Sequence, residues 1–523
     1  MKFTGRKNFA EVRKIRFARD TFDMSHTHQM AGDWGWLYPV FYEEASPTDY
    51  WKLNQSLVAK MMPTIAPLQH EINAFVHYYF VPYRLIHNQW EDFITGGPDG
   101  QNASTLPQWD PSDSDKTPGS LWDHFGFPLT ECTGVRPINY PLRAYNFVWS
   151  EYYRDENLTS EVPYPYEANI YSSGAAATYR LCQRAWEKDY VTASLPWQQR
   201  GIAPSLPITG TTFAEWVGAD IVQAVAGTFN AAFKGGSVDP VIVTGDNTAA
   251  GTQARENALA FLNSNTVDFA DASTFDVADL RAAIQIQRWM ERNARGGARY
   301  TEVLEQHFND APEDSRLQRP EYIGGYRCPI SIVEVLQTSE DGTTPQGNRA
   351  GIGSAYSSGH VGTYKVKEYG IIIGLLSIMP RTMYTQGVNR QWLRRTRYDF
   401  LWPEFVNLSE QAVLKGELFA SDTEATNVET FGYQGRYDEL RQRANRAVGL
   451  MRQSTSGLIY WNLSRKFATA PALNQQFVTV ETQDLKDRVF QYPNEPGFII
   501  TLGNIATVDR ALPTVAEPGL MDH

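Results

Sequence analysis

Carboxylates lie beside aromatic rings at two places in the chain, in the segments 90–92, WED, and 402–404, WPE. Glycoside hydrolases use such a combination, a pair of carboxylates flanked by rings that stack on sugars. The same combination is typical of protein interfaces, where Trp and Tyr supply contact area and acids occupy the rim. We favour the interface interpretation and keep an aromatic-rich all-β glycoside hydrolase, or a carbohydrate-binding module, as the alternative function.

No motif for a nucleophile, a phosphate or a metal is complete. The glycine-rich segment 351–359, GIGSAYSSG, lacks the Lys-Ser/Thr of a phosphate loop, so we expect a mobile surface loop there. His26 and His28 have no third ligand at a suitable spacing, and His70 lacks the second histidine of a zinc-protease helix. We therefore predict a protein that is not an enzyme and has no catalytic residue, no cofactor and no metal.

Arginines and aromatic residues are interleaved between residues 390 and 398. The arginines are Arg390, Arg394, Arg395 and Arg397, and the rings are those of Trp392 and Tyr398. Guanidinium groups hold phosphates while rings stack on bases without sequence preference, so this segment is a candidate for nucleic-acid contact. Ion pairs with the carboxylates of another subunit are an alternative that the sequence supports at least as well.

Charge is distributed unevenly along the 523 residues. The formal net charge of −12 argues against a protein that coats nucleic acid with its whole surface, because phosphate neutralisation requires many Lys and Arg. The first 19 residues are nevertheless basic, with Glu11 as their single acid. Their basic residues are Lys2, Arg6, Lys7, Arg13, Lys14, Arg16 and Arg19. We predict that this arm contacts nucleic acid or an internal protein, although a solvated, frayed terminus has the same composition.

Cysteine usage and hydropathy indicate the cellular setting. Cys132, Cys182 and Cys328 are too widely spaced for a disulfide framework or a zinc signature, which favours folding in a reducing cytoplasm. The longest apolar run, 371–379, is far shorter than the roughly 20 residues that span a bilayer. The N-terminus lacks the apolar region of a signal peptide, so we predict neither secretion nor membrane insertion.

The segment 72–81 has the clearest strand pattern, with large apolar side chains on both faces and Pro82 expected to end it. The segment 85–94 has helical spacing and is stopped by Gly96 and Gly97. Further strands are expected at 37–42, 190–193, 330–336, 363–379 and 498–502, and helices at 277–293, 300–308 and 437–452. Scattered strands with long connections favour an antiparallel sandwich with enlarged loops over an alternating α/β fold.

Residues 202–275 differ in composition from the rest. They contain two basic residues, Lys234 and Arg255, against seven acids, and they are rich in Ala, Thr, Gly and Asn. Contact with a polyanion is unfavourable for such a segment, so we expect it to project into solvent. A flexible loop without a dedicated role is the alternative.

Seven blocks, together with the segment 61–97, resemble the major capsid proteins of microviruses, specifically the gokushovirus branch of small single-stranded DNA phages. The blocks are FDMSH at 22–26, YVTASLPWQQRG at 190–201, ERNARGGARYTEVLEQHF at 291–308, RLQRPEYIGG at 316–325, RRTRYDFLWPEF at 394–405, FGYQGRY at 431–437 and PGLMDH at the C-terminus. The run DELRQRANRAVGL after Tyr437 departs from the family pattern, so roles are not carried beyond it.

The resemblance implies a mainly β fold, a single eight-stranded jelly-roll sandwich with long loop and helical insertions. It implies a basic N-terminal arm at 1–36, a jelly-roll capsid domain at 37–523, and within it a surface-projecting insertion at 202–275. Interface or packing candidates are the rings of Tyr83, Trp90, Phe93, Trp197, Trp392, Tyr398 and Trp402.

The implied function is that of the main shell subunit of a virion assembled in the host bacterial cytoplasm. About 60 copies would close a T=1 icosahedral shell around a circular single-stranded DNA genome. The implied partners are a small basic DNA-binding protein, other phage structural proteins, and a host surface receptor bound through 202–275.

Overall fold

The computed structural model describes residues 18–98, 101, 104–109, 115–129, 135–162, 170–171, 179–202, 211–213, 228–233, 241–246, 266–268, 277–296, 299–309, 313–338, 346–452 and 457–515. The chain divides into two compact units. One unit is formed by residues 1–198 together with 293–523, and the other by residues 199–292.

The first sheet of the larger unit has six antiparallel strands. In spatial order they are β1 (Asp20–Asp23), β18 (Phe498–Arg510), β4 (Tyr50–Met61), β14 (Arg349–Lys365) and β13 (Ser331–Leu336), and β2 (His26–Gly32) also pairs with β18. Side chains of β4 and β18 alternate between buried and exposed, because successive residues of a strand point to opposite faces. One face of this sheet therefore packs in the interior and the other faces outward.

The second sheet is four-stranded and also antiparallel. Its order is β12 (Glu321–Pro329), β5 (Ile72–Pro82), β15 (Gly370–Pro380) and β3 (Leu37–Ala45). Trp51, Leu57 and Ile500 of the first sheet share one hydrophobic core with Val76 and Ile372 of the second. The two sheets thus pack face to face, which is consistent with a β-sandwich.

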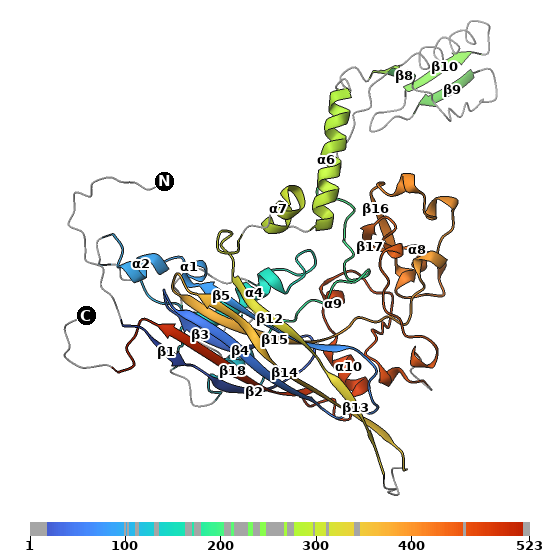
Figure 1. Cartoon of the computed structure of the whole chain (residues 1–523). Helices are drawn as coiled ribbons and strands as arrows, with labels where there is room; N and C mark the ends of the chain where they lie inside the picture. Colours follow the sequence, from blue (N-terminus) through green and yellow to red (C-terminus); the bar gives the residue numbers. More distant parts are fainter. Residues whose placement is uncertain are drawn as a thin grey trace. The chain divides into compact units, whose positions relative to one another are not determined.

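Helices cover the other face of the second sheet. They are α1 (Tyr83–Ile86), α2 (Trp90–Thr95), α3 (Leu121–His124) and α4 (Tyr140–Tyr152). Tyr79 and Val81 of β5 and Ile373 of β15 pack there against Tyr145 and Val148 of α4. Strands β5 and β15 are therefore buried on both faces, and Figure 1 shows the layers of helices, second sheet and first sheet in this order.

The C-terminal part of the larger unit consists of short elements. They are η2 (Arg390–Trp392), η3 (Arg397–Asp399), η4 (Pro403–Phe405), β16 (Glu410–Leu414), η5 (Lys415–Glu417), α8 (Glu424–Val428), β17 (Thr430–Gly435), η6 (Asp438–Leu440), η7 (Gly449–Arg452), η8 (Ile459–Trp461), α9 (Gln475–Val478) and α10 (Thr482–Val489). Val413, Phe431 and Phe477 form their small core with Tyr190 and Tyr384.

The remaining elements follow one another in the chain between α4 and β12, except β6, which lies in the chain between α2 and α3. They are the parallel pair β6 (Gln108–Trp109) and β7 (Ile170–Tyr171), the antiparallel pairs β8 (Thr211–Phe213) with β11 (Thr266–Asp268) and β9 (Thr228–Phe233) with β10 (Val241–Asp246), and the helices α6 (Val277–Gly296) and α7 (Tyr300–Phe308). Among the described residues the chain is of mixed structure, with more strand than helix.

Most of the predicted elements are present. Strands occupy 37–45, 72–82, 331–336 and 498–510, and helices occupy 277–296 and 300–308, as expected. The expected helix at 85–94 is two short helices, α1 and α2, and Gly96 ends the second with a left-handed φ of 79°. The expected run 363–379 is the end of β14 and nearly all of β15, separated at residues 366–369.

The expectation of a mobile loop at 351–359 is wrong, because these residues lie within β14. Gly351 and Gly353 are buried on the inward face of this strand. A Cβ at Gly351 would lie 2.5 Å from the Thr64 hydroxyl, and one at Gly353 would lie 2.9 Å from Met61. The glycines are therefore explained by close packing and not by mobility.

The predictions of a strand at 190–193 and of a helix at 437–452 are also wrong. The Asp189 carboxylate accepts hydrogen bonds from the backbone N–H groups of Val191 and Thr192, which closes a turn in place of a strand. Residues 437–452 contain only the short η6 and η7, because Tyr437 adopts φ 64° and Arg446 is held by the Gly387 carbonyl. Tertiary contacts override the helical spacing there.

Candidate functional site

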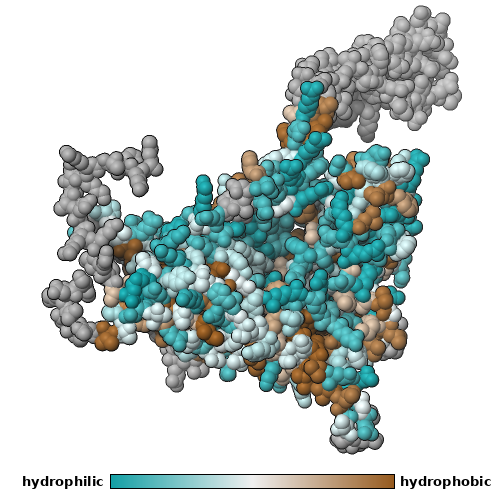
Figure 2. All heavy atoms as spheres, in the orientation of Figure 1, coloured by the Kyte–Doolittle hydropathy of each residue, from teal (hydrophilic) through white to brown (hydrophobic). Residues whose placement is uncertain are grey.

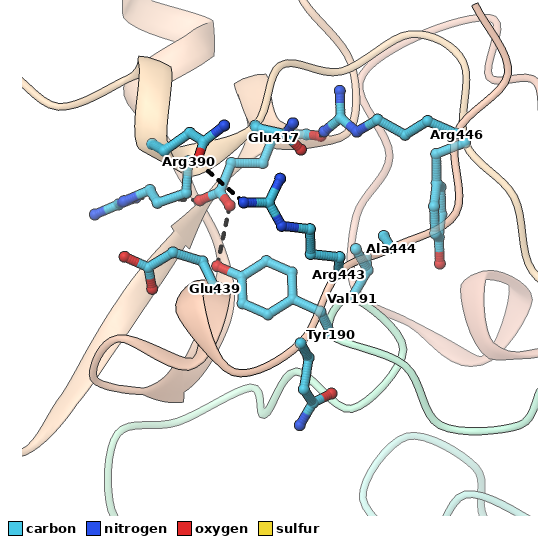
Figure 3. Close-up of a pocket in the computed structure, with 12 residues that line it drawn as sticks. Tyr190, Val191, Arg390, Glu417, Glu439, Arg443, Ala444 and Arg446 are labelled. Carbon is cyan, nitrogen blue, oxygen red and sulfur yellow. Dashed lines mark hydrogen bonds and ion pairs between the residues drawn. The ribbon is translucent and has the colours of Figure 1, made fainter.

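The arginine-rich segment folds as short 3-10 turns around two buried carboxylates. Arg390 lies 3.1 Å from the Glu417 carboxylate, which also accepts a hydrogen bond of 3.0 Å from the Tyr190 hydroxyl. Burial raises the pKa of Glu417, and the charge of Arg390 opposes that rise. Figure 3 shows Tyr190, Glu417 and Arg443 gathered around one pocket. The cavity of about 30 Å³ has room for one or two water molecules but not for a nucleotide.

The second buried carboxylate is that of Glu439. Arg394 pairs with it at 3.2 Å, Gln411 donates to it at 2.6 Å, and the Arg394 guanidinium also lies over the Phe400 ring. Both partners of this ion pair are almost fully buried. Of the four arginines that this segment offers for nucleic-acid contact, Arg390 and Arg394 are therefore neutralised by carboxylates of their own subunit.

Arg395 and Arg397 are exposed, and so are the rings around them. Arg395 pairs loosely with Glu424 at 3.4 Å, and the Arg397 guanidinium lies 4.8 Å from the Tyr398 ring centroid. The exposed apolar side chains of this segment are Trp392, Tyr398, Phe400, Leu401 and Trp402, of which Trp392 is 72% exposed. We call these five residues the 392–402 patch. An exposed group of large aromatic side chains is typical of an interaction surface.

Hydrophobic surface continues beyond this segment. Leu408 and Val428, the latter on α8, are each more than half exposed. Figure 2 shows brown residues gathered at the surface in the region of α8 and β16. The surface of this region is thus more apolar than a solvated face requires.

Tyr83, Trp90 and Phe93 lie where the chain leaves β5 and forms α1 and α2, and we call these three residues the aromatic corner. Tyr83 belongs to a hydrophobic core of the subunit, and Trp90 packs against that core. Tyr83 is buried, whereas Trp90 and Phe93 are half-buried. The Trp90 ring lies 5.0 Å from Tyr83 and 6.0 Å from Tyr140, both in edge-to-face geometry, and 5.9 Å from Phe93. These ring contacts hold helix α2 against Tyr83 and Tyr140, while part of Trp90 remains exposed. Trp197 is half-buried too.

Arg19 is the described basic residue of the N-terminal arm. It forms an ion pair with Asp509 at 3.0 Å and donates hydrogen bonds to the hydroxyl and carbonyl of Thr48. Lys2, Arg6, Lys7, Arg13, Lys14 and Arg16 lie outside the described residues. Within the segment 1–36, residues 20–23 and 26–32 are strands of the first sheet.

Metal sites and membrane-spanning helices can be assessed only for the residues that the structure describes. Over those residues no group of three or more His, Cys, Asp and Glu side chains is placed to hold a metal ion. Within the same residues, no helix combines the length and hydropathy needed to cross a bilayer. Cys182 and Cys328 are buried free thiols, and Cys132 lies outside the described residues.

Sequence reasoning did not find the carboxylates at the centre of this network. Tyr190 and Glu417 are 227 residues apart, and no spacing rule connects either of them or Glu439 with the arginines. A strand-rich subunit that neutralises its arginines internally and presents a patch of aromatic rings is typical of a structural protein that forms assemblies.

Comparisons with known proteins identify the family. Residues 10–520 match the family described as Capsid protein (F protein). The chain is 32% identical to capsid protein VP1 of Chlamydia phage 1, with 98% of each chain covered. It is 31% identical to capsid protein VP1 of Bdellovibrio phage phiMH2K, with 95% of each covered, and 26% identical to capsid protein VP1 of Spiroplasma virus 4, with 98% of this chain and 97% of that one covered.

The chain therefore belongs to the Capsid protein (F protein) family and is a major capsid protein of the small single-stranded DNA microviruses. It is a structural component of the virion and not an enzyme, so the glycoside hydrolase alternative is excluded. The resemblance to the gokushovirus type is confirmed.

Proposed function

We propose that this capsid protein forms, from about 60 identical copies, a closed icosahedral shell around a circular single-stranded DNA genome. The subunit would supply a rigid two-sheet body, and its insertions would supply the contacts that differ between symmetry axes. The observation that carries the proposal is the strand order of the two sheets.

That order supports a jelly roll. Four strands, β2-β18-β4-β14, are neighbours in one sheet, and four others, β3-β15-β5-β12, are neighbours in the second. Followed along the chain, β2, β3, β4 and β5 alternate between the sheets, and so do β14, β15 and β18. An eight-stranded jelly roll built from two Greek keys has this alternation, and the fold is common in viral shells.

The 392–402 patch is our candidate for contact with a neighbouring subunit. Since Arg390 and Arg394 are paired with buried carboxylates, only Arg395 and Arg397 of the segment remain near the surface with exposed rings. Large rings with an arginine are the composition of a protein interface core. This favours the interface interpretation of the segment over nucleic-acid contact.

Two further parts of the chain have proposed roles. The basic residues at 2–16 would face the interior and contact DNA or the small basic DNA-binding protein, because the subunit as a whole carries a net charge of −12. Residues 202–275 would project outward and contact the host receptor, because they contain seven acids and only two basic residues. Other phage structural proteins would complete the particle.

Co-expression with the structural genes of the phage tests the proposal. Sedimentation and electron microscopy of the purified material are expected to show uniform closed particles containing nuclease-protected DNA. A protein that stays monomeric or forms only small, open oligomers under these conditions would contradict it. Trp392→Ala combined with Trp402→Ala is expected to reduce particle yield while the melting temperature of the free subunit stays within a few degrees.

A further inference from the structure

One face of the first sheet packs in the sandwich core, and its other face points away from that core. We call this second face the outer face of the sheet, with respect to the subunit and not to a shell. On β4 it is formed by Tyr50, Lys52, Asn54, Ser56, Val58 and Lys60, all exposed or half-exposed, while the residues between them are buried. Figure 1 shows β18, β4 and β14 side by side, with helices α1, α2 and α4 on the side of the second sheet. The outer face is thus a broad surface made of strands.

Neighbouring strands continue this surface in register. Lys60 lies opposite Ser354 of β14 and Ile499 of β18, and Val58 lies opposite Tyr356 and Thr501. Hydroxyl-bearing and apolar side chains therefore alternate across the face with lysines at intervals. Tyr356 at its centre is 74% exposed, although a large ring gains from burial.

The charge of the outer face is opposite to that of the protein. Lys52, Lys60 and Lys365 are exposed on it, and none of them has an ion pair with any residue that the structure describes. The carboxylates of the face, Asp23 and Asp509, lie together at the margin beside β1, and Asp509 is already paired with Arg19. A cationic surface without carboxylates at its centre is unexpected on a chain of net charge −12.

Several arginines of the chain differ from these lysines because they form ion pairs within the subunit. Arg84, Arg154, Arg390, Arg394 and Arg510 all pair with a carboxylate of their own subunit. Each of these arginines is neutralised by a carboxylate of the same subunit, so it attracts a distant polyanion only weakly. The three lysines of the outer face keep their charge available for a ligand.

We infer that the outer face of the first sheet binds single-stranded DNA. Proteins that bind single strands without sequence preference combine a cationic surface for the phosphates with exposed rings on which bases stack. The outer face offers both, in Lys52, Lys60 and Lys365 and in Tyr50 and Tyr356. That the strand is the packaged genome rests on the proposed function, but the binding surface is argued from the charges and rings alone.

A second protein copy fits this face less well. Lysine is depleted in the cores of protein interfaces, whereas here Lys52, Lys60 and Lys365 lie across β4 and β14. The exposed apolar residues that lie together on this face, Val333, Val335 and Ile352, are at its margin beside β13. Along β4 the eight steps from Lys52 to Lys60 span about 26 Å, at about 3.3 Å each. Sheet-based modules that bind single strands cover about 4 to 16 nucleotides, and several nucleotides fit along this length.

The test uses the purified full-length subunit and a fluorescent oligothymidylate. Anisotropy titrations between 50 and 200 mM salt compare the parent with the triple variant Lys52→Gln, Lys60→Gln, Lys365→Gln. In the triple variant the slope of log affinity against log salt concentration is expected to be less steep by about 2. Each phosphate contact to a single strand contributes about 0.7 to this slope, and three contacts are removed. Tyr356→Ala is expected to weaken binding about fivefold or more and Tyr356→Phe to retain it, since stacking needs the ring.

The matched control removes the same charge elsewhere, as Arg281→Gln, Arg316→Gln, Lys466→Gln, all at exposed positions. It is expected to keep the parental salt dependence. An equal loss in the control, or a parental slope in the outer-face triple with an unchanged melting temperature, would overturn the inference. Because binding is measured on free subunits, a failure of particle assembly would count against the proposed function and leave this inference standing.

Discussion

Asn504 of β18 accepts a hydrogen bond of 3.2 Å from the Tyr78 hydroxyl of β5, across the interior between the two sheets. The same amide accepts from Gln55 at 2.8 Å and donates to the Val40 carbonyl at 2.9 Å. Tyr326 of β12 donates in turn to Gln55 at 3.1 Å. One buried amide of β18 therefore joins that strand to β3, β4 and β5, and polar groups of this kind fix the register of facing sheets when all are satisfied.

Replacement of this amide should be costly. Asn504→Ala is expected to lower the free energy of unfolding by about 3 kcal/mol, because Gln55 and the Val40 carbonyl lose their partner inside the core. Tyr78→Phe removes one hydroxyl only, and about 1 kcal/mol is expected. Urea denaturation of both variants measures the difference. Equal effects would mean that the amide contributes no more than a single hydrogen bond.

The aromatic corner gives a second prediction. Full burial of Trp90 would make Trp90→Ala cost about 3 to 5 kcal/mol. The ring is only half-buried, so we expect about 2 kcal/mol, with Trp90→Phe costing less because it keeps the contacts with Tyr83 and Tyr140. Denaturation of the subunit and particle yield are measured together. Unchanged stability together with unchanged yield would exclude a role of this ring in folding and in assembly.

The buried ion pair of Glu417 differs from an exposed one. Glu417→Gln is expected to destabilise the subunit by about 3 kcal/mol, because the Arg390 charge stays buried without a counter-charge. Glu424→Gln, which removes the exposed partner of Arg395, is expected to cost less than about 1 kcal/mol. Thermal and urea unfolding of the two variants at neutral pH make the comparison. Similar losses would show that solvent screens Glu417 as well as it screens Glu424.

Buried histidines predict the behaviour of the subunit in acid. Burial lowers the pKa of His77 to about 4, with a further contribution from the Arg184 charge, and burial beside Arg143 lowers the pKa of His87 to about 4. The unfolded chain takes up these protons near its ordinary histidine pKa of about 6.5, before the folded chain does. Stability is therefore complete above about pH 6.5 and is lost as pH falls towards 4.

The loss should be at most about 1.4 kcal/mol per pH unit for each such histidine. We expect His77→Gln to flatten the dependence of unfolding free energy on pH between 6.5 and 4. Since the Nδ1 of His77 lies 2.9 Å from the Tyr153 hydroxyl, glutamine retains a polar partner there. His360→Gln, at an exposed position, is the control and should keep the parental dependence. An identical slope in the His77 variant and the parent would contradict the prediction.

The sequence predicted the strands whose side chains carry their own pattern. Strand β5 was predicted because Ile72, Val76 and Phe80 recur on one face, and β18 because of its apolar start. The first part of strand β14 was missed, since its inward residues are Gly351, Gly353 and Ala355, and this part depends on close packing and not on hydrophobic periodicity. Local spacing contains no information about such a contact.

The candidate site was predicted less completely. The segment 390–398 was identified by its composition, but composition does not tell a paired arginine from a free one. Arg390 and Arg394 are neutralised by Glu417 and Glu439, which no spacing rule connects with them. The lysines of the outer face belong to β4 and β14, far apart in the chain, and they come together only through strand pairing.

The last prediction concerns residues 202–275, which we propose to project from the subunit and to contact the host. They lie within the smaller unit, 199–292, which forms a compact body distinct from the sandwich. A short Gly/Ser linker in their place is expected to leave the sandwich folded, because a change in loop length alters the closure cost by only about 1 kcal/mol. Adsorption to host cells should fall much more than subunit stability or particle yield. The measurements are the melting temperature, the yield of particles, and cell binding by labelled particles, each compared with the parent. A subunit that fails to fold would place the segment in the core, and normal adsorption by the deletion would show that receptor contact lies elsewhere on the particle.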